Sequence, residues 1–165
     1  MTRILGLNPG LAETGYGIID AGSGRFRHIA HGVISTPPDM ETGTRLNVIY
    51  ERLLALVREY GPREAGIENL YFARNITSAL PVAQARGVAL LVFARRKVLC
   101  RGYPPQAIKQ ALVGNGRADK KQVGELVRLL LGLPEVPKPD HAADALAAAI
   151  CHAHTRGGCP DVQQL

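Results

Sequence analysis

The order of the hydrophobic patterns constrains the fold of this chain more than any other feature. Three strand-like runs come first, over residues 3–7, 16–19 and 27–34, and the pair Pro37-Pro38 ends this region. Helical and strand-like patterns alternate beyond it. Strands that follow one another directly pair antiparallel, whereas strands joined through a helix pair in parallel. The order therefore predicts an α/β domain with a mixed sheet, antiparallel at first and parallel afterwards.

The second part of the chain holds the helical patterns. Apolar residues recur at helical spacing from Leu46 to Val57, and this pattern ends near Gly61-Pro62. Small residues along the next predicted helix would allow another helix to approach closely. That helix covers residues 75–97, and the remaining predicted elements are strands over 65–68 and 98–103 and helices over 106–113, 119–131 and 140–154.

The composition is that of one folded domain with its own core. The chain has 165 residues, 46% of them hydrophobic, and no long block of like charge. This excludes extensive disorder, and a chain of this length needs neither disulfides nor a structural metal to fold. We therefore expect residues 1–165 to form a single domain. The three cysteines are an odd number, which favours free thiols over a disulfide framework.

Charged residues interrupt the longest apolar stretches, at Arg86, Arg95 and Arg96 in one and at Asp144 in another. No stretch reaches the roughly 20 clean apolar residues of a membrane helix. The first residues run into a strand pattern and lack the apolar core of a secretory signal. We therefore expect a cytoplasmic protein without a membrane segment. The net charge of +6 favours an anionic partner, with nucleic acid first.

Soft metal ligands gather near the C-terminus, at Cys151, His152, His154 and Cys159. Such a group could hold zinc, but its spacing is not that of a zinc finger or ribbon. Zinc at this position is the less favoured interpretation.

Two oxygen-bearing side chains stand where predicted strands end. Asn8 follows the first strand and Glu68 ends the fourth. If these two strands pair in parallel, both side chains lie at the carboxyl edge of the sheet, where α/β folds place chemistry. A carboxylate directly after Ala65-Gly66-Ile67 is unfavourable unless it is paired or metal-bound, so we favour a functional role for Glu68.

The last predicted helix begins with further metal-binding side chains. His141 and Asp144 are three residues apart and Asp140 and Asp144 four apart, so either pair shares a helix face. Carboxylate oxygens suit magnesium or manganese, and an imidazole shifts the preference towards manganese. The alternatives are ordinary ones. Asp140 follows a proline at a helix start, and we favour an N-cap role for it; His141 and Asp144 could simply be solvated.

Five segments in order make the chain resemble the RuvC-type Holliday junction resolvases of the ribonuclease H-like superfamily, and the resemblance covers nearly the whole chain. The segments are Leu5-Gly6-Leu7-Asn8-Pro9-Gly10 with Thr14-Gly15-Tyr16-Gly17; Ile67-Glu68 with Tyr71 and Asn75; Gln84-Ala85-Arg86-Gly87-Val88; Lys109-Gln110 with Gly114-Asn115-Gly116 and Lys120; and His141-Ala142-Ala143-Asp144-Ala145-Leu146-Ala147.

The resemblance implies a ribonuclease H-like fold with a mixed five-stranded sheet flanked by helices. It also implies an endonuclease that resolves four-way DNA junctions in recombination and repair, with two divalent cations, Mg²⁺ or Mn²⁺, per subunit. The implied partners are four-way junction DNA, a second copy of the chain in a homodimer, and the branch-migration helicase complex of RuvA and RuvB. The implied metal ligands are Asn8, Glu68, His141 and Asp144.

The resemblance also implies roles in DNA contact. Lys109 and Lys120 fall where the family has basic residues near the scissile phosphate, and Tyr71 falls where it has an aromatic that enters the junction. From the residues themselves, Tyr71 beside Arg74 could stack on an unpaired base, with Phe72 more typical of a core aromatic. The loop over residues 114–121 offers backbone donors to a phosphate and adds Arg117 and Lys121 to the DNA-binding set. A solvated surface position is the alternative for these lysines, and for Lys121 it is the favoured interpretation.

One departure from the family pattern bears on activity. The first motif normally carries Asp, and this chain has Asn8. An amide lacks the charge needed to bridge two divalent cations, so we expect weakened catalysis. A junction-binding protein without nuclease activity is therefore the main alternative. An actin-like ATP-binding domain, whose phosphate loop the first motif also resembles, is less favoured because those proteins need a much longer chain.

Overall fold

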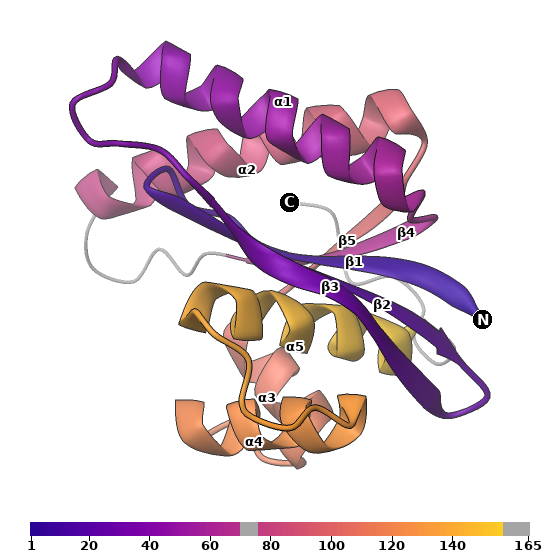
Figure 1. Cartoon of the computed structure of the whole chain (residues 1–165). Coiled ribbons are helices and arrows are strands. Elements are labelled where there is room, and N and C mark those ends of the chain that lie inside the picture. The colour runs from indigo at the N-terminus through magenta and orange to yellow at the C-terminus, as the bar shows by residue number, and fades with distance from the viewer. Residues whose placement is uncertain (70–75, 157–165) are drawn as a thin grey trace.

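Five strands form one mixed sheet in the computed structural model, which describes residues 1–69 and 76–156 (Figure 1). The strands are β1 (Thr2–Asn8), β2 (Glu13–Gly22), β3 (Arg25–Ser35), β4 (Glu64–Glu68) and β5 (Leu99–Tyr103), in the spatial order β3-β2-β1-β4-β5. The pairs β1–β2 and β2–β3 are antiparallel, and β1–β4 and β4–β5 are parallel. The mixed sheet expected from the sequence is confirmed.

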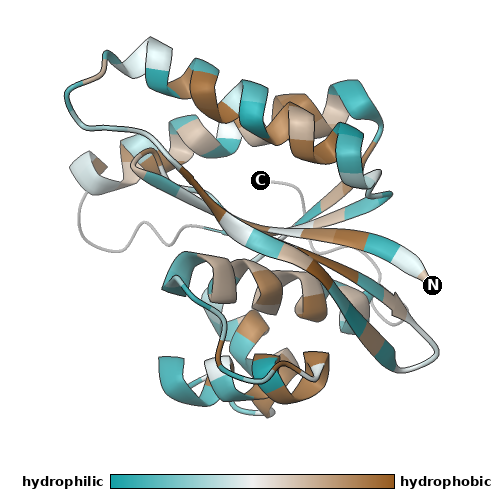
Figure 2. Cartoon of the chain, viewed as in Figure 1, coloured by the Kyte–Doolittle hydropathy of each residue, from teal (hydrophilic) through white to brown (hydrophobic). Residues whose placement is uncertain are grey.

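Helices cover both faces of this sheet (Figure 1). On one face lie α1 (Thr42–Tyr60) and α2 (Ile76–Arg96); on the other lies α5 (Asp140–Thr155), backed by α3 (Pro105–Val113) and α4 (Lys120–Leu131). Side chains of β1 alternate between two hydrophobic cores, one on each face of the sheet. Ile4 packs on the α5 side, whereas Leu5 and Leu7 pack on the α1 and α2 side. Figure 2 shows the matching pattern on α1, where hydrophobic and hydrophilic residues alternate along the helix.

The last helix approaches the sheet unusually closely. Its alanines from Ala145 to Ala149 are buried, and β1 and β2 present glycines beneath them. A Cβ added to Gly6 would overlap the carbonyl oxygen of Ala145, and one added to Gly15 would overlap that of His141. Small residues on both surfaces therefore bring the backbone of α5 directly over the ends of β1 and β2.

Within the described residues, α2 is the one helix long and apolar enough to cross a membrane, judged by length and composition only. This is weak evidence, because the core helix of a soluble protein passes the same test. Ala85, Ala89 and Phe93 of this helix are buried in the core that α1 shares, whereas Leu80 and Leu91 remain exposed. One face of α2 therefore packs on the core, and the opposite face exposes apolar side chains to solvent.

Candidate active site

Parallel pairing of β1 and β4 brings the two predicted strand-end residues to the same edge of the sheet. Leu7 is paired with Ile67, so Asn8 and Glu68 are the next residues along their strands. The prediction that these strands are parallel is confirmed.

The N-terminal turn of α5 adds two more predicted residues at this edge. The Nδ2 group of Asn8 donates a hydrogen bond to Oδ2 of Asp144 at 3.2 Å and lies 3.4 Å from Nδ1 of His141. An amide nitrogen can only donate, so Nδ1 of His141 is the acceptor of this contact. Asn8, His141 and Asp144 therefore form one contact group at the end of β1.

Glu68 lines a cavity of about 220 Å³ beside this group. Lys109, Lys120 and Asp144 contribute the other charged side chains of the lining. The pKa of Glu68 is raised to about 7, mainly by burial and then by the negative charge of Asp144, while Lys120 and Lys109 oppose the rise. The charged form of the Glu68 carboxylate is therefore disfavoured in this cavity, and a bound cation would stabilise it.

Lys120 is held at the mouth of the same cavity by two carboxylates. Its Nζ lies 3.4 Å from Oδ2 of Asp144 and 3.5 Å from Oδ2 of Asp140. Burial lowers the pKa of Lys120, but the two carboxylates outweigh burial and the net shift is upward. Lys120 is the first residue of α4, whose start is fixed by a capping box between Asp119 and Gln122. The ammonium group is therefore charged and directed towards Asp144.

The N-cap role favoured for Asp140 is wrong. Pro139 occupies the cap position without a side-chain hydrogen bond, and Asp140 is the first residue of α5. Its carboxylate is 76% exposed and pairs with Lys120. The preceding Pro139 has no N–H to donate but can begin a helix with its fixed φ, so the cap falls one residue earlier than expected.

No pattern in the sequence marks the residue that contacts His141 on its other side. Nε2 of His141 lies 3.4 Å from Oε2 of Glu13, the first residue of β2. Both side chains line a hollow next to the Glu68 cavity, together with Thr36 and Arg45. Glu13 follows the Gly10 turn in a position that no periodicity marks, and only the three-dimensional contact with α5 reveals it.

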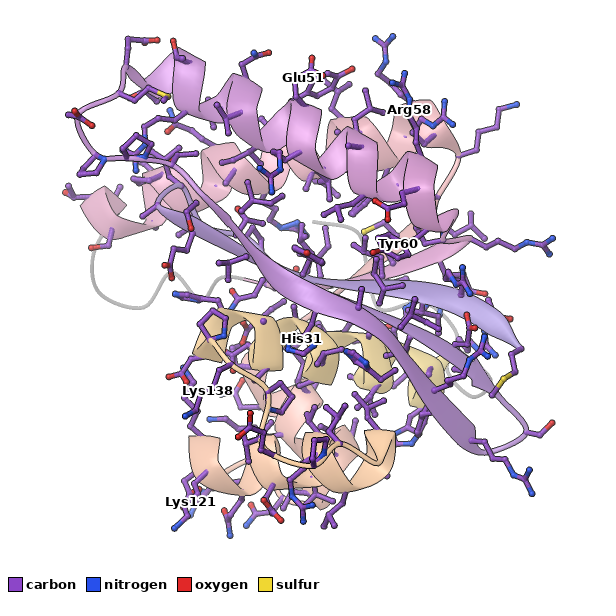
Figure 3. All side chains as sticks on the ribbon, in the orientation of Figure 1. His31, Glu51, Arg58, Tyr60, Lys121 and Lys138 are labelled. Carbon is purple, nitrogen blue, oxygen red and sulfur yellow. The ribbon has the colours of Figure 1, made fainter. Side chains whose placement is uncertain are left out.

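Two of the predicted DNA-binding residues, Arg117 and Lys121, do not line the cavity. Arg117 and Lys121 are exposed, and Figure 3 shows Lys121 projecting from α4 away from the sheet, as the solvated alternative requires. The backbone donors expected from the loop over residues 114–121 are largely used within it: the N–H groups of Arg117 and Ala118 bond to Asn115, and that of Asp119 bonds to Gln122. Tyr71, Phe72 and Arg74 lie outside the described residues.

Three of the four C-terminal side chains considered for zinc, Cys151, His152 and His154, have other partners. His152 is buried and bonds to Tyr103 and Glu64, while Cys151 and His154 contact backbone carbonyls of α3. Cys100 and Cys151 are free thiols, as expected, and Cys159 lies outside the described residues. Across residues 1–69 and 76–156, no three His, Cys, Asp or Glu side chains converge closely enough to hold a metal ion, here or at the strand ends.

The family of this chain follows from comparison with known proteins. The family model of the crossover junction endodeoxyribonuclease RuvC matches residues 4–152. The chain belongs to the RuvC family.

A curated RuvC relative, the crossover junction endodeoxyribonuclease RuvC of Treponema denticola, is 53% identical over 147 residues, covering 89% of this chain and 83% of its own. A solved RuvC structure, from T. thermophilus in complex with Holliday junction substrate, is 33% identical with a TM-score of 0.91, covering 94% of this chain and 95% of the other. The yeast mitochondrial resolvase Ydc2 shares the fold at 13% identity and a TM-score of 0.65, covering 93% and 79%. The ribonuclease H-like fold expected for a RuvC-type chain is confirmed.

Proposed function

We propose that this chain is a structure-selective endonuclease that resolves four-way DNA junctions by hydrolysing phosphodiester bonds, in DNA recombination and repair. The observation that carries the proposal is the cavity in which Glu68 and Asp144 face Lys109 and Lys120, in a chain of the RuvC family. The T. thermophilus relative described in complex with a Holliday junction supports junction DNA as the substrate. An ATP-binding function has no support from this family.

The donor set suits hard divalent cations. Glu68 and Asp144 offer carboxylate oxygens, Asn8 an amide oxygen and His141 a ring nitrogen. The pKa of Glu68 is raised mainly by burial, and a bound cation would stabilise its charged form. We propose that these four residues hold two cations per subunit, Mg²⁺ or Mn²⁺, and that binding draws Glu68, His141 and Asp144 closer together than they lie in the metal-free arrangement. When bound, the cations would activate water and stabilise the leaving oxygen.

The lysines act directly on the phosphate in this proposal. Lys109 and Lys120 line the cavity, and Lys120 keeps its charge because of the carboxylates beside it. Both offset negative charge that develops on the scissile phosphate. Tyr71 and Arg74 contact the junction outside the metal site, and Arg117 and Lys121 contribute long-range attraction to the DNA backbone.

Asn8 weakens this catalysis without abolishing the site. In the structure its amide donates a hydrogen bond to Asp144, so the amide N–H points at an oxygen that a cation would use. Asp at this position would add a charge and remove that donor. A junction-binding protein without nuclease activity is not favoured, because the other acidic and basic residues of the cavity are present.

The exposed face of α2 supports a homodimer. Ile76, Leu80 and Leu91 on this helix are 74%, 57% and 53% exposed. Large apolar side chains gathered on one helix mark an association surface, and two identical sites suit a substrate with two equivalent strands to cut. We further propose a cytoplasmic location and cooperation with the RuvA and RuvB branch-migration complex.

A labelled four-way junction and a linear duplex of matched sequence test the proposal. With Mg²⁺ or Mn²⁺ the protein is expected to nick two opposing strands of the junction and to leave the duplex intact, whereas Glu68→Gln binds the junction without cutting it. If the junction stays intact with every metal, even after Asn8→Asp, the nuclease proposal is wrong.

A further inference from the structure

Asn69, the residue after Glu68, is hydrogen-bonded to β5, and its side chain lies on the face of the sheet opposite the cavity. The backbone N–H of Asn69 donates to the carbonyl oxygen of Tyr103 at 2.7 Å, which continues the β4–β5 pairing past the end of β4. Successive side chains of an extended segment point to opposite faces. Glu68 accordingly lines the cavity on the α3 and α5 side, while Asn69 meets α2.

Arg86 of α2 holds the Asn69 side chain. Its Nη2 donates to Oδ1 of Asn69 at 2.8 Å. The amide of Asn69 lies over Gly102 of β5, where a Cβ would overlap Oδ1. The charge of Arg86 also lowers the pKa of the Cys100 thiol against the larger effect of burial, which places the guanidinium beside β5. We call Asn69, Arg86 and Gly102 the exit clamp.

The exit clamp is more than a surface contact. Among residues 1–69 and 76–156, Nη1 of Arg86 is the one buried side-chain nitrogen or oxygen without a hydrogen-bond partner in residues that are not exposed. Burying a guanidinium nitrogen in this way is unfavourable. A neutral apolar residue would join α2 to the sheet at a lower cost, so packing alone does not account for a charge here. The segment Gln84-Ala85-Arg86-Gly87-Val88 also supplies no metal ligand or phosphate contact in the proposed function.

We propose that Arg86, acting through Asn69, is a positioning residue that fixes the exit of β4 and thereby the direction of the Glu68 carboxylate. The inference rests on the proposed nuclease function. Because Glu68 and Asn69 are consecutive, rotation of the Asn69 peptide moves the Glu68 side chain relative to Asp144. Displacements of about 1 Å at a catalytic group can reduce turnover by about 100-fold.

Variants at three positions test the exit clamp in the Asn8→Asp background, where the restored carboxylate is expected to make cleavage faster. Arg86→Met removes the donor, Asn69→Ala removes the acceptor, and Gly102→Ala displaces the amide. Each variant is expected to lower the single-turnover cleavage rate at least 10-fold. Its affinity for Mn²⁺, measured in the absence of DNA, should fall by a similar factor, and its affinity for the junction should stay within 2-fold of that of Asn8→Asp. Asn69→Asp, which keeps the acceptor, retains the rate. Arg95→Met, an exposed arginine of the same helix, is the matched control.

The outcomes separate the two proposals. Lower thermal stability with unchanged cleavage rate and unchanged Mn²⁺ affinity, measured well below the melting temperature, would show that the exit clamp only holds α2 to the sheet. An equal loss of cleavage rate in Asn69→Asp and Asn69→Ala would also overturn the positioning role, because the acceptor oxygen for Arg86 would then have no effect. If no protein of the series cuts, the nuclease proposal fails, and the Mn²⁺ affinities alone decide whether Arg86 positions Glu68. Absence of any Mn²⁺ binding overturns the positioning role as well.

Discussion

Glu68 carries a charge where the fold disfavours it. Its pKa is raised from an ordinary 4.5 to about 7 by burial and by Asp144. The folded chain therefore binds a proton between these pH values that the unfolded chain has already lost, so the free energy of unfolding falls as pH rises through this window and levels off above it. A metal ion would offset this loss, which links the stability of the site to its function.

Replacing this group by its neutral isostere tests the linkage. Glu68→Gln is expected to leave the metal-free protein equally stable near pH 4.5 and to stabilise it by up to about 3 kcal/mol at pH 8. Urea unfolding in EDTA from pH 4.5 to 8 measures the difference. Glu51→Gln, at an exposed position of α1, is the control and should show no such pH-dependent gain. A gain for Glu68→Gln that is the same at both pH values would show that ionisation is not its source.

At the scale of elements, the site depends on how closely α5 lies on the sheet. Gly15 of β2 is in contact with the backbone at His141, the second residue of α5. A methyl group there has no space, so Gly15→Ala must displace the helix start that carries His141 and Asp144. We expect a loss of about 1 to 3 kcal/mol in stability from overpacking. Mn²⁺ affinity should also fall at least 10-fold, as measured by calorimetry.

Gly87→Ala gives the matched control for this substitution. Gly87 lies inside α2 with nothing near the added Cβ, so it should raise stability by roughly 0.5 to 1 kcal/mol and leave Mn²⁺ affinity unchanged. If Gly15→Ala loses stability but keeps full Mn²⁺ affinity, the distance between α5 and the sheet does not set the metal site.

The elements themselves were predictable because their patterns are local. Three strand runs and a later run after a helix sufficed to predict that Asn8 and Glu68 share one sheet edge, and the β1–β4 pairing confirms the parallel arrangement. Contacts between elements were not predictable in this way. Glu13 reaches His141 only because α5 crosses the start of β2, and Asp140 pairs with Lys120 only because α4 packs beside α5. No pattern within one element encodes either contact.

For the whole molecule, the exposed apolar face of α2 leads to a prediction about assembly. Leu80 and Leu91 expose more than half of their surface, and burying them between two copies would remove this area from water. The double variant Leu80→Glu/Leu91→Glu is expected to sediment as a monomer where the unmodified chain sediments as a dimer at micromolar concentration. Leu129→Glu, at an equally exposed position on α4, should remain dimeric. A monomeric unmodified chain, or a dimer that survives the double substitution, would contradict this interface.

Restoring a carboxylate at the end of β1 tests whether position 8 limits metal-dependent cleavage. In our interpretation the molecule is a junction nuclease whose cleavage rate is limited by the uncharged Asn8 between His141 and Asp144. The measurement is the single-turnover cleavage rate of a four-way junction by the unmodified chain and by Asn8→Asp, in Mg²⁺ and in Mn²⁺, with junction affinity measured alongside. We expect the cleavage rate to rise by orders of magnitude for Asn8→Asp, more in Mn²⁺ because of the His141 nitrogen, with junction affinity changed only a few-fold. Equal rates for the two proteins would contradict this interpretation, because position 8 would then serve geometry rather than metal binding.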